Sequence, residues 1–350
     1  MVSKPIPIKP SLPCSSSDVD HFLSRPSPAL YDMVKTRPGD FMILGAAGKM
    51  GLHICLMLRL ALNEIGDNRR VIAVSRFSNP GAAETFQKHS IETIRCDLSE
   101  ADELDSLETA ENIIFMAGIK FETSGQPDLL HRMNIEMPQQ VAAKFRKSHI
   151  TAFSTGCVYS YYPVGGGGPV ESETCQPTGD YAKSCLGREE AFLWAAKTYG
   201  TPVSLIRLNY SVEFRYGVPV DLAVKILRSE PIELAMGHAN IIWQRDAVLF
   251  SLLGHGHTSP SPFILNVTRP EILRIRDIAI RLGELIGREP IFEGTEASKA
   301  WISNPGKAIE LFGEPETDIE TILSYVAAWQ INNLPTLDKP TGFEKRDGNF

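Results

Sequence analysis

Short apolar runs alternate with longer amphipathic segments through the middle of the chain, from Asp40 to Asn209. The apolar runs have the length of strands, and we predict strands at 41–46, 71–76, 91–96, 112–118, 150–155 and 203–209. The segments between them predict helices that begin near Met50, Ala82, Glu100, Pro127 and Tyr181. Strict alternation of strand and helix is typical of a parallel sheet that is covered on both faces. The pattern therefore predicts an α/β fold with a doubly wound parallel sheet.

The two ends of the chain lack this alternation of strand and helix patterns. Residues 1–37 are rich in proline and serine, and their short helical patterns at 18–25 and 27–35 predict an arm that packs onto the body or onto a partner subunit. After residue 210 the pattern breaks into shorter pieces and ends with helices at 274–287 and 318–330. We therefore predict three parts: an arm (1–37), a domain built on the parallel sheet (38–210), and a region that is mainly a smaller lobe with a C-terminal tail (211–350).

Composition narrows the class of protein. The 350 residues are 43% hydrophobic and carry a formal net charge of -7, with no run of Lys or Arg, so nucleic acid is not an expected partner. No segment reaches the roughly 18 apolar residues that cross a bilayer, and the first residues lack the apolar stretch of a secretory signal. We expect a soluble, cytoplasmic protein that does not bind membranes.

The six cysteines are scattered without CxxC pairs, which argues against a disulfide framework and a zinc site. They are expected to be reduced thiols. Two histidines in the segment Gly254–His257 are flanked by Gly and Pro, which favours a solvated loop, and we predict no metal site there.

A glycine-rich turn, "FMILGAAGKMG", joins the first predicted strand to its helix. Gly45, Gly48 and Gly51 would permit the tight turn, the approach of backbone to a pyrophosphate and the packing of helix on strand. The second strand ends with Ser75 and Arg76, where an NAD-selective site would offer a carboxylate, so NADP is favoured and NAD is not excluded.

The third predicted strand ends at Asp97, which has two equally weighted interpretations. Its carboxylate could accept a hydrogen bond from the adenine amino group, or it could cap the helix that follows.

These motifs resemble the extended short-chain dehydrogenase/reductases, also called the NAD-dependent epimerase/dehydratase family, over about residues 40–330. "GAAGKMG" is similar to the family's GxxGxxG, "AFSTGCVYS" to its Ser/Thr signature strand, and "PVESETCQPTGDY" to the loop before its tyrosine. The resemblance implies a Rossmann-type fold with a smaller C-terminal substrate lobe, and carbohydrate metabolism as the setting. It also implies that a homodimer can form through the helices after the fourth and fifth strands.

The resemblance assigns roles to individual residues. Thr155 and Tyr181, with Ser154 behind them, would be catalytic. Substrate contacts would include Cys157, Asn209, Trp243 and Gln244, although for Trp243 the alternative of a core position is slightly preferred. Cofactor contacts are expected at Gly45, Gly48, Lys49, Met50, Gly51, Ser75, Arg76, Asp97, Leu98, Ala117, Gly118 and Asn134.

The chain departs from the family at the position four residues after the tyrosine. The family holds a lysine there, which favours the phenolate and lies on the same helix face as the tyrosine, but this chain has Cys185. A thiol has little power to lower the pKa of Tyr181. Lys120, from the loop after the fourth strand, and Arg188, two turns along the helix, are the candidate replacements, and for Lys120 an exposed surface position is an equally weighted alternative.

A second departure concerns the type of reaction. The family's 4,6-dehydratases carry an Asp-Glu pair directly after the catalytic threonine, and this chain has Gly156 and Cys157 there, so that dehydration is disfavoured. The glycine run in "YYPVGGGGPVE" suits a mobile lid and equally a plain insertion.

Three functional hypotheses follow. The first is an NAD(P)-dependent oxidoreductase or epimerase that acts on a hydroxyl or keto group of a sugar, sugar acid or nucleotide sugar. The second is an NADP-binding sensor of the same fold without catalysis, which the loss of the lysine suggests. In the third, Cys157 or Cys185 acts directly as an acid, base or nucleophile.

Overall fold

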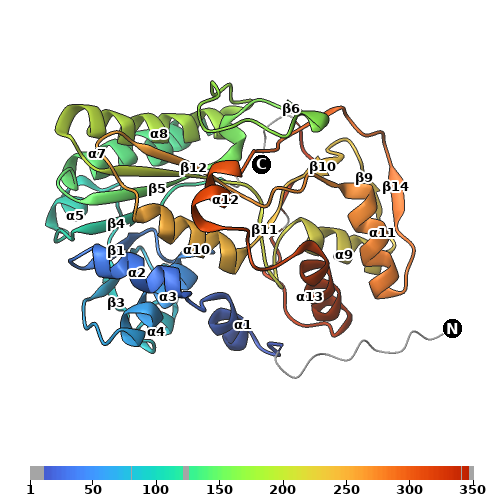
Figure 1. Ribbon diagram of the computed structural model, residues 1–350, viewed down its shortest axis with the longest axis horizontal. Coiled ribbons are helices and arrows are strands. Elements are labelled where there is room, and N and C mark those ends of the chain that lie inside the picture. The colour runs from blue at the N-terminus through green and yellow to red at the C-terminus, as the bar shows by residue number, and fades with distance from the viewer. Residues whose placement is uncertain (1–11, 80, 121–125, 340, 347–350) are drawn as a thin grey trace.

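A seven-stranded parallel sheet forms the centre of the computed structural model, which describes residues 12–79, 81–120, 126–339 and 341–346 (Figure 1). Its strand order is β12-β7-β5-β4-β1-β2-β3. The strands are β1 (Phe41–Leu44), β2 (Val71–Ser75), β3 (Glu92–Arg95), β4 (Asn112–Phe115), β5 (His149–Thr155), β7 (Val203–Leu208) and β12 (Phe263–Val267). The prediction of a doubly wound sheet is confirmed, and six of the seven strands lie where the hydrophobic pattern put them.

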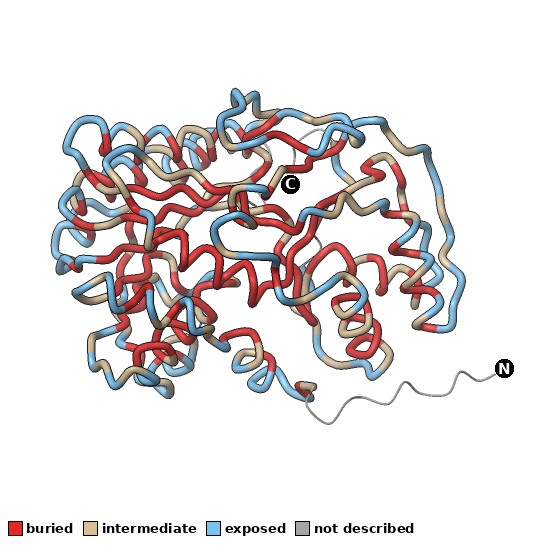
Figure 2. The backbone as a smooth tube through the Cα atoms, viewed as in Figure 1, coloured by how far each residue is buried: buried red, intermediate tan, exposed pale blue. Residues whose placement is uncertain are grey.

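Helices cover both faces of the sheet, so the sheet is buried on both sides (Figure 2). Successive side chains of a strand point to opposite faces: Phe41 and Ile43 of β1 pack in one apolar layer, and Met42 and Leu44 in the other. The first layer is completed by α2 (Pro28–Thr36), α3 (Gly51–Glu64) and α10 (Gln244–His255). The second is completed by α5 (Ala101–Ser106), α7 (Met137–Lys144) and α8 (Asp180–Tyr199).

Two elements after residue 210 return to the central sheet, which the sequence pattern did not predict. β12 adds the seventh strand beside β7, and α10 packs beneath β5, β7 and β12. The boundary placed at residue 210 is therefore too simple, because the chain enters the lobe, comes back to the sheet, and leaves again.

His255, at the end of α10, corrects a second expectation. It is fully buried rather than in a solvated loop, and its ring nitrogens lie 2.9 Å from the Thr151 hydroxyl and 3.0 Å from the Asn112 amide oxygen. Burial lowers the pKa of His255 to about 3, so it is a neutral core residue. Its partners explain why a histidine is stable there.

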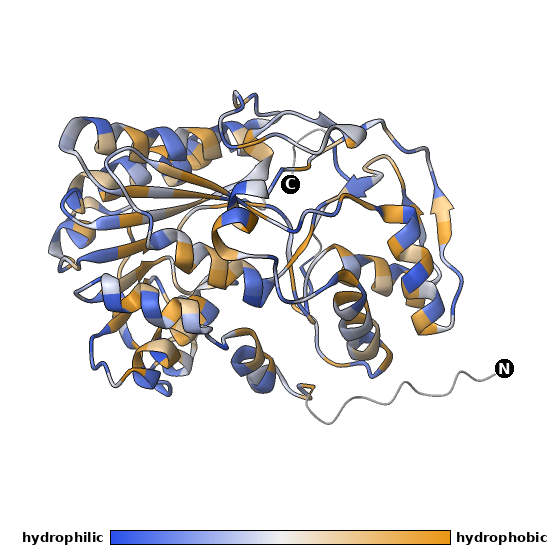
Figure 3. Cartoon of the chain, viewed as in Figure 1, coloured by the Kyte–Doolittle hydropathy of each residue, from blue (hydrophilic) through white to orange (hydrophobic). Residues whose placement is uncertain are grey.

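The smaller lobe has its own apolar core, visible as the inward hydrophobic faces of its three long helices (Figure 3). These are α9 (Val218–Arg228), α11 (Ile275–Ile286) and α13 (Ile319–Ile331). Short strands complete it and join it to the body: β6 (Tyr162–Pro163), β8 (Ser211–Val212), β9 (Pro231–Glu233), β10 (His238–Ala239), β11 (Ile242–Trp243), β13 (Leu273–Arg274), β14 (Ile291–Glu293) and β15 (Lys299–Ala300). The remaining elements are α4 (Ala82–Gln87), α6 (Pro127–His131), α12 (Gly306–Phe312), a π-helical turn η1 (Arg132–Glu136), and the 3-10 turns η2 (Gly156–Val158) and η3 (Val164–Gly166).

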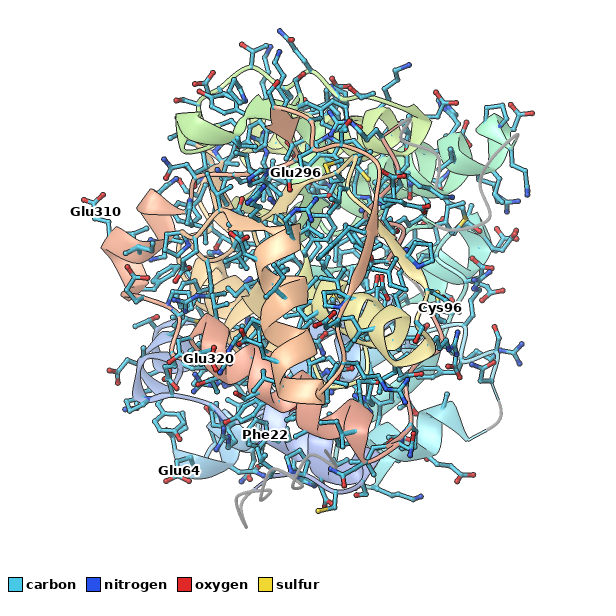
Figure 4. All side chains as sticks on the ribbon, turned by 90° about the vertical axis from the view of Figure 1, so that its right-hand side faces the viewer. Phe22, Glu64, Cys96, Glu296, Glu310 and Glu320 are labelled. Carbon is cyan, nitrogen blue, oxygen red and sulfur yellow. The ribbon has the colours of Figure 1, made fainter. Side chains whose placement is uncertain are left out.

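The N-terminal arm packs onto this chain's own body and lobe. In α1 (Ser16–Leu23), Phe22 lies edge-on to Phe214 and Tyr325 of the lobe, at centroid distances of 5.5 and 5.8 Å, and Figure 4 shows Phe22 beside the lobe helices. Asp20 of the same helix accepts hydrogen bonds from His53 of α3 and Arg215 of the lobe, each 3.0 Å long. One helix thus connects both parts of the molecule.

Candidate functional site

The glycine turn after β1 opens onto a cavity of about 320 Å³ at the carboxyl ends of β1, β2, β3 and β4. Gly45 has a φ of +87°, and a Cβ there would lie 2.7 Å from the backbone nitrogen of Ala117, so only glycine fits. A Cβ on Gly51 would lie 2.1 Å from the Ala46 carbonyl oxygen, which explains the third glycine. The turn therefore has the close packing and exposed backbone that a dinucleotide pyrophosphate requires.

Most of the expected cofactor contacts line this cavity. They are Gly45, Gly48, Ser75, Arg76, Asp97, Leu98, Ala117 and Gly118. The Asp97 carboxylate accepts hydrogen bonds from the backbone and hydroxyl of Ser99, at 3.0 and 2.7 Å, and it lies 4.0 Å from the Arg76 guanidinium. Asp97 does not cap α5, whose N-cap is Glu100, because its carboxylate instead holds the turn at Ser99. Its side chain lines the cavity, and the contact with adenine stays a prediction.

Two residues of the glycine turn have other roles. Met50 is buried in the apolar layer beneath the turn, and a direct cofactor contact is not supported by that position. Lys49 points toward the lobe, where its ammonium donates to the Ser211 carbonyl at 3.1 Å and lies 3.6 Å from the centroid of the Tyr216 ring. Burial lowers the pKa of Lys49 to about 7, although the nearby Glu213 carboxylate opposes this.

Asn134 lies behind the cavity in the π-helical turn η1 and is fully buried. Its amide oxygen accepts from the Ile119 nitrogen at 3.0 Å and from the Arg188 guanidinium at 2.7 Å. Its amide nitrogen donates to the Ile119 carbonyl at 3.0 Å and to the Ser184 hydroxyl at 2.9 Å. Asn134 thus fastens the loop after β4 to α8 and positions cavity-lining backbone, in place of the predicted cofactor contact.

Thr155 ends β5 at the carboxyl edge of the sheet, next to the start of α8. Its hydroxyl oxygen accepts from the Cys157 backbone nitrogen at 3.2 Å, and the hydroxyl also hydrogen-bonds to the Cys157 thiol. A substrate oxygen would be a stronger acceptor for the hydroxyl proton than this thiol. Ser154 points the other way and donates to Glu189, 2.5 Å away, which is paired with Arg207 in a buried ion pair of 2.7 Å. The catalytic role predicted for Ser154 is therefore replaced by a structural one.

Asn209 lies directly against Gly156. A Cβ on Gly156 would be 1.7 Å from the Asn209 amide oxygen, so the side chains that a dehydratase places here have no room without rearrangement. The Asn209 amide also donates to the Ser303 hydroxyl at 3.1 Å. Asn209 thus forms the wall of the turn after Thr155, which agrees with its predicted place beside the site.

Tyr181 and Cys185 share one face of α8. Burial, together with the Cys185 and Cys157 thiols, raises the pKa of Tyr181 well above its usual value, and the charge of Arg188 opposes this. The Tyr181 hydroxyl and the Cys185 thiol hydrogen-bond to each other. Tyr181 is therefore a neutral phenol at ordinary pH, which is the protonation state expected when the lysine is absent.

The two candidate cations lie on either side of this pair. The Lys120 ammonium is 5.8 Å from the centroid of the Tyr181 ring, and burial lowers the pKa of Lys120. Arg188 packs behind Gly118, where a Cβ would lie 2.2 Å from the guanidinium, and it donates to the Phe153 carbonyl at 3.3 Å. Lys120 is thus near the tyrosine ring, while Arg188 acts on Tyr181 through its field.

Three further predictions are revised by the structure. Burial raises the pKa of Cys157 and of Cys185, although Lys120 opposes this at Cys157 and Arg188 at Cys185, so both are neutral thiols and weak nucleophiles. Trp243 belongs to the lobe core, edge-on to Phe214 at 5.0 Å, as its alternative interpretation held. Gln244 is also buried, with its amide nitrogen 2.6 Å from the His53 ring, so neither it nor Trp243 is available as a substrate contact.

The sequence analysis missed two groups near Lys120. Asp221 of α9 and the segment Thr341–Arg346, which we call the C-terminal segment, are hydrogen-bonded to each other, and the Lys120 ammonium donates to Thr341. Burial raises the pKa of Asp221 to about 6, although hydrogen bonds from Thr341 oppose that rise. No periodicity marks "TGFEKR" as structured, so only a three-dimensional contact could reveal it.

Comparison with known proteins gives a family match over the body of the molecule. Residues 41–212 match the model of the NAD dependent epimerase/dehydratase family, a range that runs from β1 to β8 and includes the glycine turn, Thr155 and Tyr181. No curated protein matches the chain in sequence.

Solved structures share the fold at low sequence identity. UDP-glucose 4-epimerase from Thermus thermophilus, in complex with NAD, aligns with a TM-score of 0.68 and 17% identity, covering 83% of this chain and 99% of the other. UDP-glucuronic acid 4-epimerase from Bacillus cereus, in complex with UDP-glucuronic acid and NAD, aligns with a TM-score of 0.66 and 17% identity, covering 84% of this chain and 99% of the other. UDP-glucose 4-epimerase from Thermotoga maritima, with UDP-glucose, aligns with a TM-score of 0.67 and 18% identity, covering 84% of this chain and 99% of the other. Among the described helices, none is both long and apolar enough to cross a membrane.

Proposed function

Because residues 41–212 match the model of the NAD dependent epimerase/dehydratase family, we propose that this protein is an NAD(P)-dependent oxidoreductase or epimerase. Its substrate would be a nucleotide sugar or a related sugar or sugar acid, with a hydroxyl or keto group as the reacting function. The observation that carries the proposal is the position of Thr155 and Tyr181, with Lys120 close by, at the same sheet edge as the glycine-turn cavity. Ligands of open α/β sheets bind at this edge.

The chain's own groups would divide the work as follows. The backbone at Gly45 and Gly48 would hold a pyrophosphate, and a nicotinamide dinucleotide bound there would supply the hydride donor or acceptor. The Thr155 hydroxyl, whose oxygen already accepts from the Cys157 nitrogen, would donate a hydrogen bond to the substrate oxygen and keep its proton. Tyr181 would give its phenolic proton to the same oxygen as a keto group becomes a hydroxyl.

The protonation state of Tyr181 favours one direction of reaction. Its raised pKa keeps the phenol neutral, so the resting site is ready to act as an acid and is poorly prepared to remove a proton. We therefore propose that reduction of a ketone is favoured over oxidation of an alcohol.

The finer choice of cofactor rests on the end of β2. Ser75 and Arg76 line the cavity where an acidic side chain would select NAD, and Arg76 is well exposed. We propose NADP, and fluorescence titration with NADPH and NADH tests it. Arg76→Ala should weaken NADPH binding tenfold or more and leave NADH unchanged, whereas the exposed control Arg95→Ala should affect neither. Equal loss for both cofactors would rule out recognition of the 2'-phosphate.

Turnover is tested by following NADPH and NADH absorbance, and the release of epimerised sugar, with UDP-glucose, UDP-glucuronic acid and their 4-keto forms. We expect Tyr181→Phe to lower kcat by about 10²–10⁴-fold, the usual contribution of a positioned acid. Tyr199→Phe, at the exposed end of the same helix, is the matched control and should retain full activity. Undiminished turnover by Tyr181→Phe would exclude the proposed mechanism.

One observation favours a second candidate, an NADP-binding sensor without catalysis. The family's lysine position holds the fully buried thiol of Cys185, and Tyr181 is not poised to ionise. Calorimetry separates the two candidates. Tight NADP binding without sugar-dependent redox change, together with a protein partner whose affinity responds to NADP, would support the sensor.

A further inference from the structure

The C-terminal segment packs on the lobe and reaches the body at Lys120. Phe343 is fully buried in the lobe core, and the Arg346 guanidinium lies 4.4 Å from the centroid of the Tyr161 ring. Arg346 also donates to the Lys299 carbonyl at 2.9 Å, and Glu344 pairs with Lys225 of α9. Specific contacts of Phe343, Glu344 and Arg346 therefore hold the segment in place.

Thr341 is the residue of this segment that faces the candidate site. Its backbone nitrogen and its hydroxyl both donate to one carboxylate oxygen of Asp221, at 2.8 and 2.6 Å. Its carbonyl oxygen accepts from the Lys120 ammonium at 3.5 Å. Thr341 is only 2% exposed, so these three groups are satisfied by protein instead of water.

The same lysine leads directly to the candidate acid. The Lys120 ammonium lies near the ring of Tyr181, and its charge acts on the Cys157 thiol beside Thr155. Lys49 approaches from the glycine turn closely enough for the charge of Lys120 to lower its pKa. The Lys120 side chain thus links Thr341 to Tyr181, to which we assign catalysis.

The contacts of Thr341 have the pattern that a sugar would make. A hydroxyl and a second donor are held by a carboxylate, and a carbonyl is held by an ammonium. A nucleotide sugar carries hydroxyl donors beside the carbon that becomes a ketone, in the same chemical arrangement. Asp221 and Lys120 can therefore bind either the polar groups of Thr341 or the hydroxyl and keto groups of a sugar, at the same place.

We propose that Asp221 and Lys120 form a substrate subsite that Thr341 occupies, so that the C-terminal segment is a strap which the sugar displaces. This inference rests on the proposed function only because that function makes the displacing ligand a carbohydrate. In the closed state the Thr341 carbonyl holds the Lys120 ammonium. In the open state the substrate oxygen takes that place and the Asp221 carboxylate accepts a sugar hydroxyl.

The segment is suited to leave because it is short and few of its side chains are buried. It contributes one buried aromatic side chain, Phe343, and its charged residues are half-buried or exposed. Segments with few buried apolar contacts open more readily than the core to which they are attached.

Limited proteolysis of the intact protein tests the strap, because Lys345 and Arg346 are trypsin sites within it. Cleavage is followed by mass spectrometry with saturating NADPH, with and without UDP-glucuronic acid or UDP-glucose. We expect a bound sugar to accelerate cleavage at least fivefold. Thr341→Val should accelerate it about threefold without sugar, whereas Thr336→Val, whose hydroxyl bonds only to the nearby Asp338 in the described contacts, should not.

A second measurement keeps the outcome independent of turnover. By calorimetry, a chain that ends at Lys339 should bind the nucleotide sugar about tenfold more tightly than the full chain, and Asp221→Asn should weaken sugar binding tenfold or more in both. Slower cleavage with bound sugar, or weaker binding by the shortened chain, would overturn the strap. If neither sugar binds, the proposed function fails, and an unchanged cleavage rate in Thr341→Val would then overturn the strap on its own.

Discussion

At the scale of single residues, the exchange of a lysine for Cys185 changes the chemistry of Tyr181 more than its position. The sequence alone identifies the exchange, because four residues along a helix return to the same face. It does not reveal what the surroundings do in response. Burial and the thiol keep Tyr181 protonated, Arg188 is confined behind Gly118, and Lys120 approaches the ring from a loop that is close only in three dimensions.

The pH dependence of reduction follows from this environment. Because the pKa of Tyr181 lies well above its usual value, the phenol stays protonated and kcat/KM for ketone reduction should not rise between about pH 7 and about pH 9. Cys185→Ala removes a thiol that raises this pKa, and it should keep activity within about threefold at pH 7. The measurement is the pH profile of NADPH oxidation by both proteins. A rate that climbs on the alkaline side would mean that a tyrosinate does the work.

At the scale of elements, the π-helical turn η1 is the feature that sequence patterning could not foresee. The pattern around 127–144 predicts a helix starting near Pro127, and the structure divides that stretch into α6, η1 and α7. Asn134 is aimed inward by η1, and its four hydrogen bonds join the loop after β4 to α8. Short-range periodicity predicts that a helix exists, but a local change of helical pitch depends on tertiary partners.

Asn134→Ala tests the role of this turn. Loss of the amide leaves the Ile119 backbone groups and Arg188 without a buried partner, which should lower the free energy of unfolding by about 1–3 kcal/mol. NADPH affinity should fall several-fold because Gly118, next to Ile119, lines the cavity. Urea denaturation and fluorescence titration give both quantities. Asn332→Ala, at an exposed helix end, is the control, and an equal effect there would argue against a special role for η1.

At the scale of the whole molecule, the sequence predicts the sheet better than the way in which distant segments return to it. The strands at 41–46 to 203–209 are readable because most are short apolar runs between turn signals, and the edge strand at 91–96 alternates apolar with polar residues. β12 and α10 are missed because the chain passes through the lobe first. The position of Thr341 is missed because it depends on a contact with Asp221, 120 residues away. Local patterns carry no information about such long-range pairings.

Asp20 is the clearest case in which one contact joins the arm, the body and the lobe. The Gln244 amide donates to one nitrogen of His53, which leaves the other nitrogen to donate to Asp20, and Arg215 of the lobe donates to the same carboxylate. Although burial raises the pKa of Asp20, the hydrogen bond from His53 and the charge of Arg215 hold it below its usual value. The carboxylate therefore stabilises the fold in its ionised form.

We expect Asp20→Asn to lower the free energy of unfolding by about 1–3 kcal/mol near pH 7, because partly buried donors lose a charged acceptor. A carboxylate whose folded pKa is depressed contributes stability above its unfolded pKa of about 3.9 and loses it as pH falls through the folded value. The difference between the two proteins should therefore be largest near neutrality and shrink below about pH 4, as measured by urea denaturation across this range. Asp32→Asn, in an exposed ion pair with Lys35, is the matched control and should change little at any pH. A constant difference down to about pH 3 would show that Asp20 acts through packing, and that its charge does not hold the arm to the lobe.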